Sequence, residues 1–178
     1  MNGQAPLHVV AMGVSGTGKS TVAARLAERL GLDYIEGDSH HPQANIDKMS
    51  SGVPLTDEDR RPWLETLARL VRERHEQGRS TVLTCSALRR RYRDILRSGA
   101  PDGDLFFVHL DAPFEVLEER MKAREHFMPP SLLRSQIETL EPLEADERGV
   151  RVDVSLPVDT VVNEAVEAIG HTRQNAQF

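Results

Sequence analysis

The stretch Gly13-Val14-Ser15-Gly16-Thr17-Gly18-Lys19-Ser20-Thr21 lies near the start of the chain and fits the pattern G-x-x-x-x-G-K-[ST]. In a loop of this kind, successive backbone N–H groups point inward and hold a chain of phosphates. Its glycines allow tight turns and a close approach of the backbone, because they carry no side chain. The stretch therefore predicts a nucleotide-binding loop that uses Gly13, Ser15, Gly16, Thr17, Gly18, Lys19, Ser20 and Thr21.

Two side chains of this loop have specific tasks. Lys19 supplies a positive charge for the outer phosphates, and Ser20 offers its hydroxyl to a Mg²⁺ ion. Residues 8–12 predict a buried strand before the loop, and apolar residues at helical spacing follow it over 22–30. In this order, the positive end of the helix dipole points at the phosphates. A glycine-rich turn that binds no ligand would need neither the strand before it nor the helix after it.

Length and composition indicate an ordinary globular protein. The chain has 178 residues, of which 39% are hydrophobic, so we expect a single domain over residues 1–178. The net charge of −6 argues against a nucleic-acid partner, and no apolar run is long enough to span a membrane. With one cysteine, Cys85, the chain cannot form an internal disulfide, and we expect a cytoplasmic location.

Strand and helix patterns alternate along the whole chain. This alternation predicts an α/β fold, a five-stranded parallel sheet with helices on both faces in three layers. One helix is expected to start after Thr56, with Pro62 in the first turn of its main part. The five predicted strands cover residues 8–12, 34–36, 81–85, 105–110 and 150–154.

The loop after the second strand carries several polar residues, and ligands in such sheets bind beyond the carboxyl ends of the strands. We expect Asp38 to orient an acceptor hydroxyl and take its proton, although it could instead cap the following turn. Glu36 could lie behind the metal and act through water. His40 and His41 have no partners at zinc-ligand spacing, so a hydrogen bond from His41 to a polar substrate is the better interpretation.

Basic residues gather in two places. Five arginines lie within 89–97; most should form a solvated helix face, but at least one should lie near the site and hold a small anion. Arg120 and Arg124 lie four residues apart, before a break in the pattern. They predict a mobile lid over about 124–140 that closes on the phosphates, or else a surface pair bonded to Glu118 or Glu119.

Further runs resemble the bacterial-type gluconokinases, small P-loop kinases related in fold to shikimate kinase. The resemblance covers nearly the whole chain, and its Asp-Arg-x-Pro-Trp and Cys-Ser-Ala-Leu runs are more specific than the glycine loop. The matching runs include Gly37-Asp38 with His41-Pro42, Asp57-Glu58-Asp59-Arg60-Arg61-Pro62-Trp63, Cys85-Ser86-Ala87-Leu88-Arg89, His126-Phe127-Met128 and Ser135-Gln136.

The resemblance implies transfer of the γ-phosphate of ATP to the 6-hydroxyl of D-gluconate, with Mg²⁺ as cofactor. It implies that Lys19, Asp38 and Arg124 are catalytic, and that Arg120 and the loop around Pro157 bind the nucleotide together with the glycine loop. Such kinases are often dimers, so a homodimer is an expectation. The residues expected to bind the sugar acid are Asp38, His41, Arg60, Ser86 and Arg93.

Two other functions stay open at this point. A kinase of another small polar or anionic acceptor, such as a shikimate-like compound, would use the same scaffold. A nucleotide-dependent switch or binding module is the other alternative. A GTPase switch would normally carry a guanine-reading Asn-Lys-x-Asp run, and the chain has none.

Overall fold

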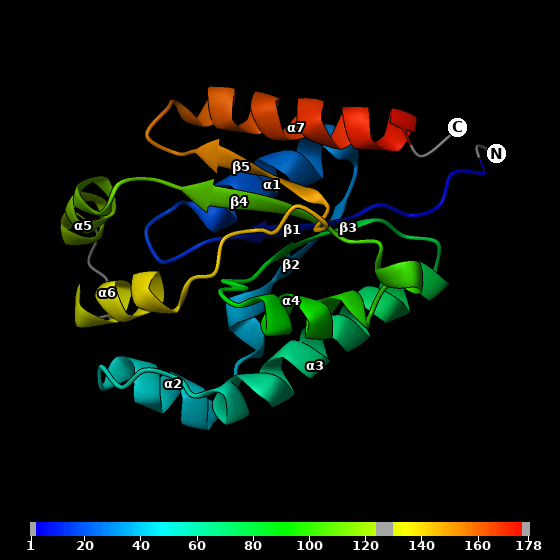
Figure 1. Ribbon diagram of the computed structural model, residues 1–178. Helices are drawn as coiled ribbons and strands as arrows, with labels where there is room; N and C mark the ends of the chain where they lie inside the picture. The colour runs from blue at the N-terminus through cyan, green and yellow to red at the C-terminus, as the bar shows by residue number, and fades with distance from the viewer. Residues whose placement is uncertain (1–2, 124–129, 176–178) are drawn as a thin grey trace.

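The computed structural model describes residues 3–123 and 130–175. Its centre is a five-stranded sheet in the order β2-β3-β1-β4-β5, in which every neighbouring pair is parallel (Figure 1). The predicted five-stranded parallel α/β fold is therefore confirmed. The strands are β1 (His8–Met12), β2 (Asp33–Glu36), β3 (Thr81–Thr84), β4 (Phe106–Asp111) and β5 (Gly149–Asp153).

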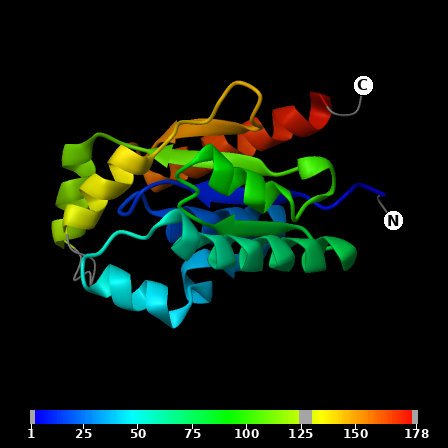
Figure 2. The same ribbon diagram turned by 60° about the horizontal axis from the view of Figure 1, so that its bottom comes forward.

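Helices cover both faces of the sheet and make the three layers. α1 (Lys19–Leu30) and α7 (Val158–Asn175) lie on one face, and α3 (Asp57–Glu76) and α4 (Arg90–Arg97) lie on the other (Figures 1 and 2). Successive side chains of a strand point to opposite faces. Val9 of β1 accordingly belongs to the core under α1 and α7, and Val10 to the core under α3 and α4.

Three further helices gather at one edge of the sheet, the edge toward which the arrowheads of β4 and β5 point in Figure 1. They are α2 (Gln43–Ser50), α5 (Phe114–Ala123) and α6 (Pro130–Thr139). The described residues also form two 3₁₀ turns, η1 (Gly37–His40) and η2 (Pro101–Gly103). Among the helices of the described ranges, none combines the length and apolar character needed to cross a bilayer.

The prediction for Pro62 is wrong, because α3 begins earlier and runs through the proline. A capping box sets the start: Thr56 Oγ1 accepts a hydrogen bond of 3.1 Å from the Asp59 N–H, and Asp59 Oδ2 accepts one of 2.9 Å from the Thr56 N–H. The helix tolerates Pro62 because this position is exposed, so the carbonyl that loses its N–H partner is on the solvent side.

Gly37 sits where β2 ends, close against the backbone of β3. Its N–H donates a 3.0 Å hydrogen bond to Thr84 Oγ1, and an added Cβ would overlap the Thr84 carbonyl oxygen. We expect Gly37→Ala to lower the free energy of unfolding by about 1–3 kcal/mol, measured by denaturant or thermal unfolding. Gly170→Ala is the matched control, because Gly170 is exposed in α7 and has open space around it. This substitution should raise the free energy of unfolding by about 0.5–1 kcal/mol. An unchanged Tm for Gly37→Ala would contradict this close contact.

Cys85 follows β3 and is 1% exposed. Burial raises the pKa of its thiol to about 12, and the thiolate is the reactive form of cysteine. We expect the folded protein at about pH 8 to react with dithionitrobenzoate far more slowly than the urea-unfolded chain. Reaction of the folded protein at the rate of the unfolded chain would show that the thiol is accessible.

Candidate functional site

The loop between β1 and α1 has the backbone conformation that its sequence predicts. The φ angles of Gly13, Gly16 and Gly18 are 148°, 86° and 82°, values that side chains disfavour. Inside the loop, Thr17 Oγ1 donates a 2.9 Å hydrogen bond to the Val14 carbonyl. The loop is therefore shaped to present its N–H groups to an anion at the start of α1.

Lys19 folds back over this loop. Its Nζ donates hydrogen bonds of 3.0 and 3.1 Å to the carbonyl oxygens of Gly13 and Val14. Loss of water around the ammonium group lowers the pKa of Lys19, while the carboxylates of Asp38 and Glu36 act in the opposite direction. The charge of Lys19 thus lies between the glycine loop and two carboxylates.

Three hydroxyl groups converge on Glu36 at the end of β2. Ser20 Oγ donates to its Oε2 at 2.9 Å, Thr84 Oγ1 donates to its Oε1 at 2.8 Å, and the Tyr34 hydroxyl also donates to Oε2. Burial acts to raise the pKa of Glu36, but these hydrogen bonds hold it below its usual value. An ionised carboxylate therefore lies beside the hydroxyl expected to bind Mg²⁺.

This donor set fits Mg²⁺, which takes oxygen ligands and keeps several waters. In the ranges that the structure describes, no group of three or more His, Cys, Asp or Glu side chains could hold a metal ion. A Mg²⁺ ion here would accordingly bind Ser20 and the phosphates of a nucleotide, with Glu36 behind it.

Two pockets flank the glycine loop. The first, which we name the α2–α6 pocket, has a volume of about 350 Å³ and is lined by parts of α2, α3 and α6. The second, the α1–α7 pocket, has a volume of about 360 Å³. The loop is a wall of both, because Ser15 and Lys19 line the first while Gly16, Thr17, Gly18 and Thr21 line the second.

The α2–α6 pocket brings together Asp38, His41, Arg60 and Ser86, four of the five residues expected to bind the substrate. The carboxylate of Asp38 is largely exposed, and its Oδ1 is 3.8 Å from His41 Nε2. The ring of His41 stacks on Trp63 with the centroids 4.0 Å apart, and burial lowers the pKa of His41 although Asp38 opposes this. His41 is therefore a neutral hydrogen-bonding group at pH 7.

Trp63 belongs to the buried core and also contributes to the site. It lines the pocket, and its Nε1 donates a 2.8 Å hydrogen bond to the Gly37 carbonyl. That bond fixes the backbone beside Asp38. On the same helix, Arg60 Nη1 donates a 2.9 Å hydrogen bond to the Tyr92 hydroxyl, which in turn donates to Asp57. Arg60 is thus held at the pocket wall by α4.

Sequence reasoning gave no role to Gln136 and Ser135, which line the same pocket from α6. Gln136 Oε1 accepts a 2.7 Å hydrogen bond from the backbone N–H of Ser15 in the glycine loop. The signal was present in the Ser135-Gln136 run of the family resemblance. No local pattern, however, shows that α6 reaches the loop.

Several of the residues predicted to bind the nucleotide lie around the α1–α7 pocket. Arg120 lines the α1–α7 pocket and donates a hydrogen bond to the Val154 carbonyl. Leu156 and Val158, on either side of Pro157, line the same pocket. Arg124 and the rest of residues 124–129 lie outside the described residues, so the part of the predicted lid that the structure describes is α6 and Leu140.

Arg93 does not reach the α2–α6 pocket, and its predicted role as a substrate ligand is corrected. Its side chain is 0% exposed. Its five hydrogen bonds go to the Glu147 carboxylate, twice, and to the carbonyls of Ala87, Glu141 and Pro142. A guanidinium has five N–H donors, so none is left for a substrate carboxylate. Within the described ranges, Arg60 is the arginine that lines the pocket.

The other arginines of the basic cluster are also paired with carboxylates. Asp57 faces Arg89 and Arg91, while Glu144 and Asp146 bond to Arg90. Arg97 bonds to Asp94 and Glu147. Because these charges are compensated, the cluster does not form the unpaired basic surface that a nucleic-acid backbone requires.

Comparison with known proteins agrees with this geometry. The AAA domain family model matches residues 9–143. A gluconokinase from Gluconobacter oxydans (strain 621H) is 50% identical over 165 residues, which cover 92% of each chain. The crystal structure of a gluconokinase from Sinorhizobium meliloti 1021 has a TM-score of 0.88 at 48% identity and covers 98% of each chain. An unliganded sugar kinase from Janibacter sp. HTCC2649 has a TM-score of 0.89 at 49% identity, over 93% of this chain and 95% of that one. The chain belongs to the gluconokinase family.

Proposed function

We propose that this protein transfers the γ-phosphoryl group of ATP to the 6-hydroxyl of D-gluconate and forms 6-phospho-D-gluconate. One observation carries the reaction type: the glycine loop is a wall of both pockets. A phosphate chain held by the loop amides therefore has an acceptor pocket directly beside it. The gluconokinases among its relatives support gluconate as the acceptor.

The α2–α6 pocket suits a small hydroxyl-bearing acid. Its volume of about 350 Å³ lies in the range of small-molecule sites. Arg60 can hold the carboxylate through two N–H groups, the geometry in which arginine binds carboxylates best. Asp38, His41 and Ser86 can then bond to the hydroxyls of the chain.

The α1–α7 pocket would hold the nucleoside end of ATP. The loop amides and Lys19 would bind the phosphates, Arg120 would lie along them, and the segment around Pro157 would pack against adenine. Ser20 would bind Mg²⁺, with Glu36 acting through water. When bound, Mg²⁺ neutralises charge on the phosphate oxygens.

The catalytic step needs two groups of this chain. Asp38 orients the 6-hydroxyl and accepts its proton as the oxygen bonds to the γ-phosphorus. The bond from that phosphorus to the bridging oxygen breaks, and ADP leaves. Lys19 stabilises the negative charge that spreads over the transferred group, and we expect Arg124 to do the same.

The direct test of function is a panel of acceptors. Coupled ADP release should be fast with D-gluconate and slow with shikimate and with the neutral hexitol sorbitol, which lacks the carboxylate. Phosphorus NMR should place the product phosphate on C6. Faster turnover with shikimate than with gluconate would overturn the choice of acceptor. The homodimer and the cytoplasmic location stay predictions, and analytical ultracentrifugation would test the first.

Asp38→Asn should lower kcat by about 100- to 10,000-fold, because the amide cannot accept the proton. ATP affinity, measured by calorimetry, should stay within about twofold, since the loop contacts are unchanged. Asp47→Asn is the matched control: it makes the same charge change on α2 at a residue that does not line the pocket. Near-normal kcat in Asp38→Asn would remove Asp38 from the role of base.

Arg60→Ala should raise the KM for gluconate by about 10- to 100-fold, the range expected for a lost charge-assisted hydrogen bond. The KM for ATP should change by less than about threefold, because Arg60 does not line the α1–α7 pocket. Arg60→Lys, which keeps the charge but not the two parallel donors, should give an intermediate value. Arg61→Ala, at the exposed neighbouring position, serves as the control. Equal effects on both KM values would show that Arg60 does not bind the acid.

A further inference from the structure

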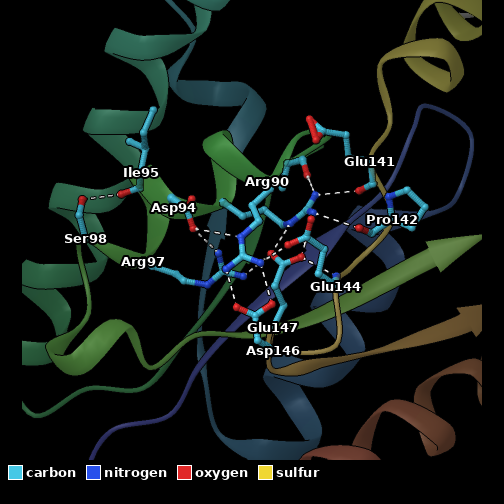
Figure 3. A network of polar contacts seen from close by, with 12 residues as sticks. Arg90, Asp94, Ile95, Arg97, Ser98, Glu141, Pro142, Glu144, Asp146 and Glu147 are labelled. Carbon is cyan, nitrogen blue, oxygen red and sulfur yellow. Dashed lines mark hydrogen bonds and ion pairs between the residues drawn. The ribbon is translucent and has the colours of Figure 1, made fainter.

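Arg93 and Glu147 form a buried ion pair next to the α2–α6 pocket. Both side chains are 0% exposed. The pair is bidentate: Arg93 Nε donates to Glu147 Oε1 at 2.7 Å, and Nη2 donates to Oε2 at 3.0 Å. Glu147 also accepts from Arg97 and, at 2.8 Å, from the Glu144 N–H (Figure 3). Arg97 also pairs with Asp94, so each arginine of this cluster has a carboxylate partner.

One side of the pair holds the segment after β3. Arg93 Nη1 donates a 2.9 Å hydrogen bond to the Ala87 carbonyl. Ala87 has a φ of 47°, a left-handed conformation that costs an alanine about 1–2 kcal/mol. Its two neighbours, Ser86 and Leu88, line the α2–α6 pocket, and the Ser86 carbonyl accepts a 3.2 Å hydrogen bond from Gly13 of the glycine loop.

The other side of the pair holds the segment that follows α6. Arg93 donates hydrogen bonds of 3.0 and 3.3 Å to the carbonyls of Glu141 and Pro142. The Glu141 N–H donates a 2.6 Å hydrogen bond to the Leu88 carbonyl, so the two held segments also bond to each other. α6, which carries Gln136, ends at Thr139 just before this point. One guanidinium thus fixes two walls of the same pocket.

We propose that Arg93 and Glu147 are positioning residues for the acceptor site. Glu147 orients the Arg93 guanidinium. Arg93 in turn holds the Ser86–Leu88 segment and the C-terminal end of α6 around the bound acid. This inference rests on the proposed function of the α2–α6 pocket. Neither residue of the pair lines the α1–α7 pocket, so its effect falls mainly on the acceptor.

Stability alone is a poor explanation for this cluster. Removing two charges from water costs so much that well-packed apolar residues often stabilise a protein as well as a buried ion pair does. An apolar pair, however, has no donors for the carbonyls of Ala87, Glu141 and Pro142. Holding these three carbonyls in place is the feature that only the arginine supplies.

The central experiment compares Glu147→Gln with wild type. Glutamine keeps the shape of glutamate but loses its charge, so Arg93 should be held less firmly. We expect the KM for gluconate to rise about tenfold or more, as for a weakened charge-assisted hydrogen bond, with the KM for ATP within about twofold. If Arg93 instead bound the substrate itself, freeing it from Glu147 would lower the KM for gluconate. A lowered or unchanged KM would overturn the proposal.

A double variant separates positioning from stability. Arg93→Met with Glu147→Leu replaces the ion pair with apolar side chains, and should be closer to wild type in Tm than Arg93→Met alone. Its KM for gluconate should nevertheless stay raised, because the carbonyls remain without their donor. Recovery of both Tm and KM would show that the pair only stabilises the fold.

Arg90→Ala is the matched control. Arg90 lies on the same helix and bonds to Glu144 and Asp146 of the same segment, but from its partly exposed side (Figure 3). Exposed ion pairs contribute little to the stability of a fold. The KM values for gluconate and for ATP should therefore stay within about twofold of wild type. A rise in the KM for gluconate equal to that of Glu147→Gln would mean that any loosening of this segment suffices, which contradicts a specific role for the buried pair.

Binding measurements keep this inference distinguishable from the proposed function. Trp63 is the single tryptophan and lines the pocket, so we expect its fluorescence to change when gluconate binds. Absence of gluconate binding and turnover in wild type would refute the proposed function. Wild-type binding with an unchanged Kd in Glu147→Gln would refute only the positioning role.

Discussion

The carboxyl ends of five parallel strands meet at one edge of the sheet, and the whole site depends on this constraint. The glycine loop follows β1, Asp38 follows β2, Ser86 follows β3, and Leu156 follows β5. Parallel hydrogen bonding between neighbouring strands fixes their relative register, so these loops cannot shift independently. Residues far apart in the sequence thereby become walls of two adjoining pockets.

Three carboxylates of this chain show how surroundings give the same group different tasks. Glu36 accepts hydrogen bonds from three hydroxyls, which keep it ionised beside the proposed metal ligand Ser20. Asp38 has a largely exposed carboxylate and lines the α2–α6 pocket, where the proposed reaction needs a proton acceptor. Glu147 is fully buried; burial acts to raise its pKa, but hydrogen bonds from Arg93 and Arg97 lower that pKa to about 2. We propose that the charge of Glu147 holds Arg93 in place and takes no part in the reaction.

Sequence reasoning was strongest where the signal is local. The glycine loop, the strands and the helix that Thr56 caps are each set by neighbouring residues, and the structure has them within a residue or two. It failed for Pro62, because a helix that is already capped and exposed at that point can accommodate a proline. It also failed for Arg93. The local sequence around an arginine near a strand end is the same whether its side chain faces a substrate or a buried carboxylate from a distant part of the chain.

The sequence by itself determined the layered α/β fold, the phosphate loop and the family, because short patterns and specific runs encode them. Only the tertiary structure decided which polar groups meet. It placed Arg60 and not Arg93 in the lining of the α2–α6 pocket, and it brought Gln136 to the glycine loop. The physical reason is that burial and hydrogen-bond partners depend on contacts between distant segments. Arg93 and Glu147 are 54 residues apart, and no local pattern of charge or hydrophobicity records that they pair.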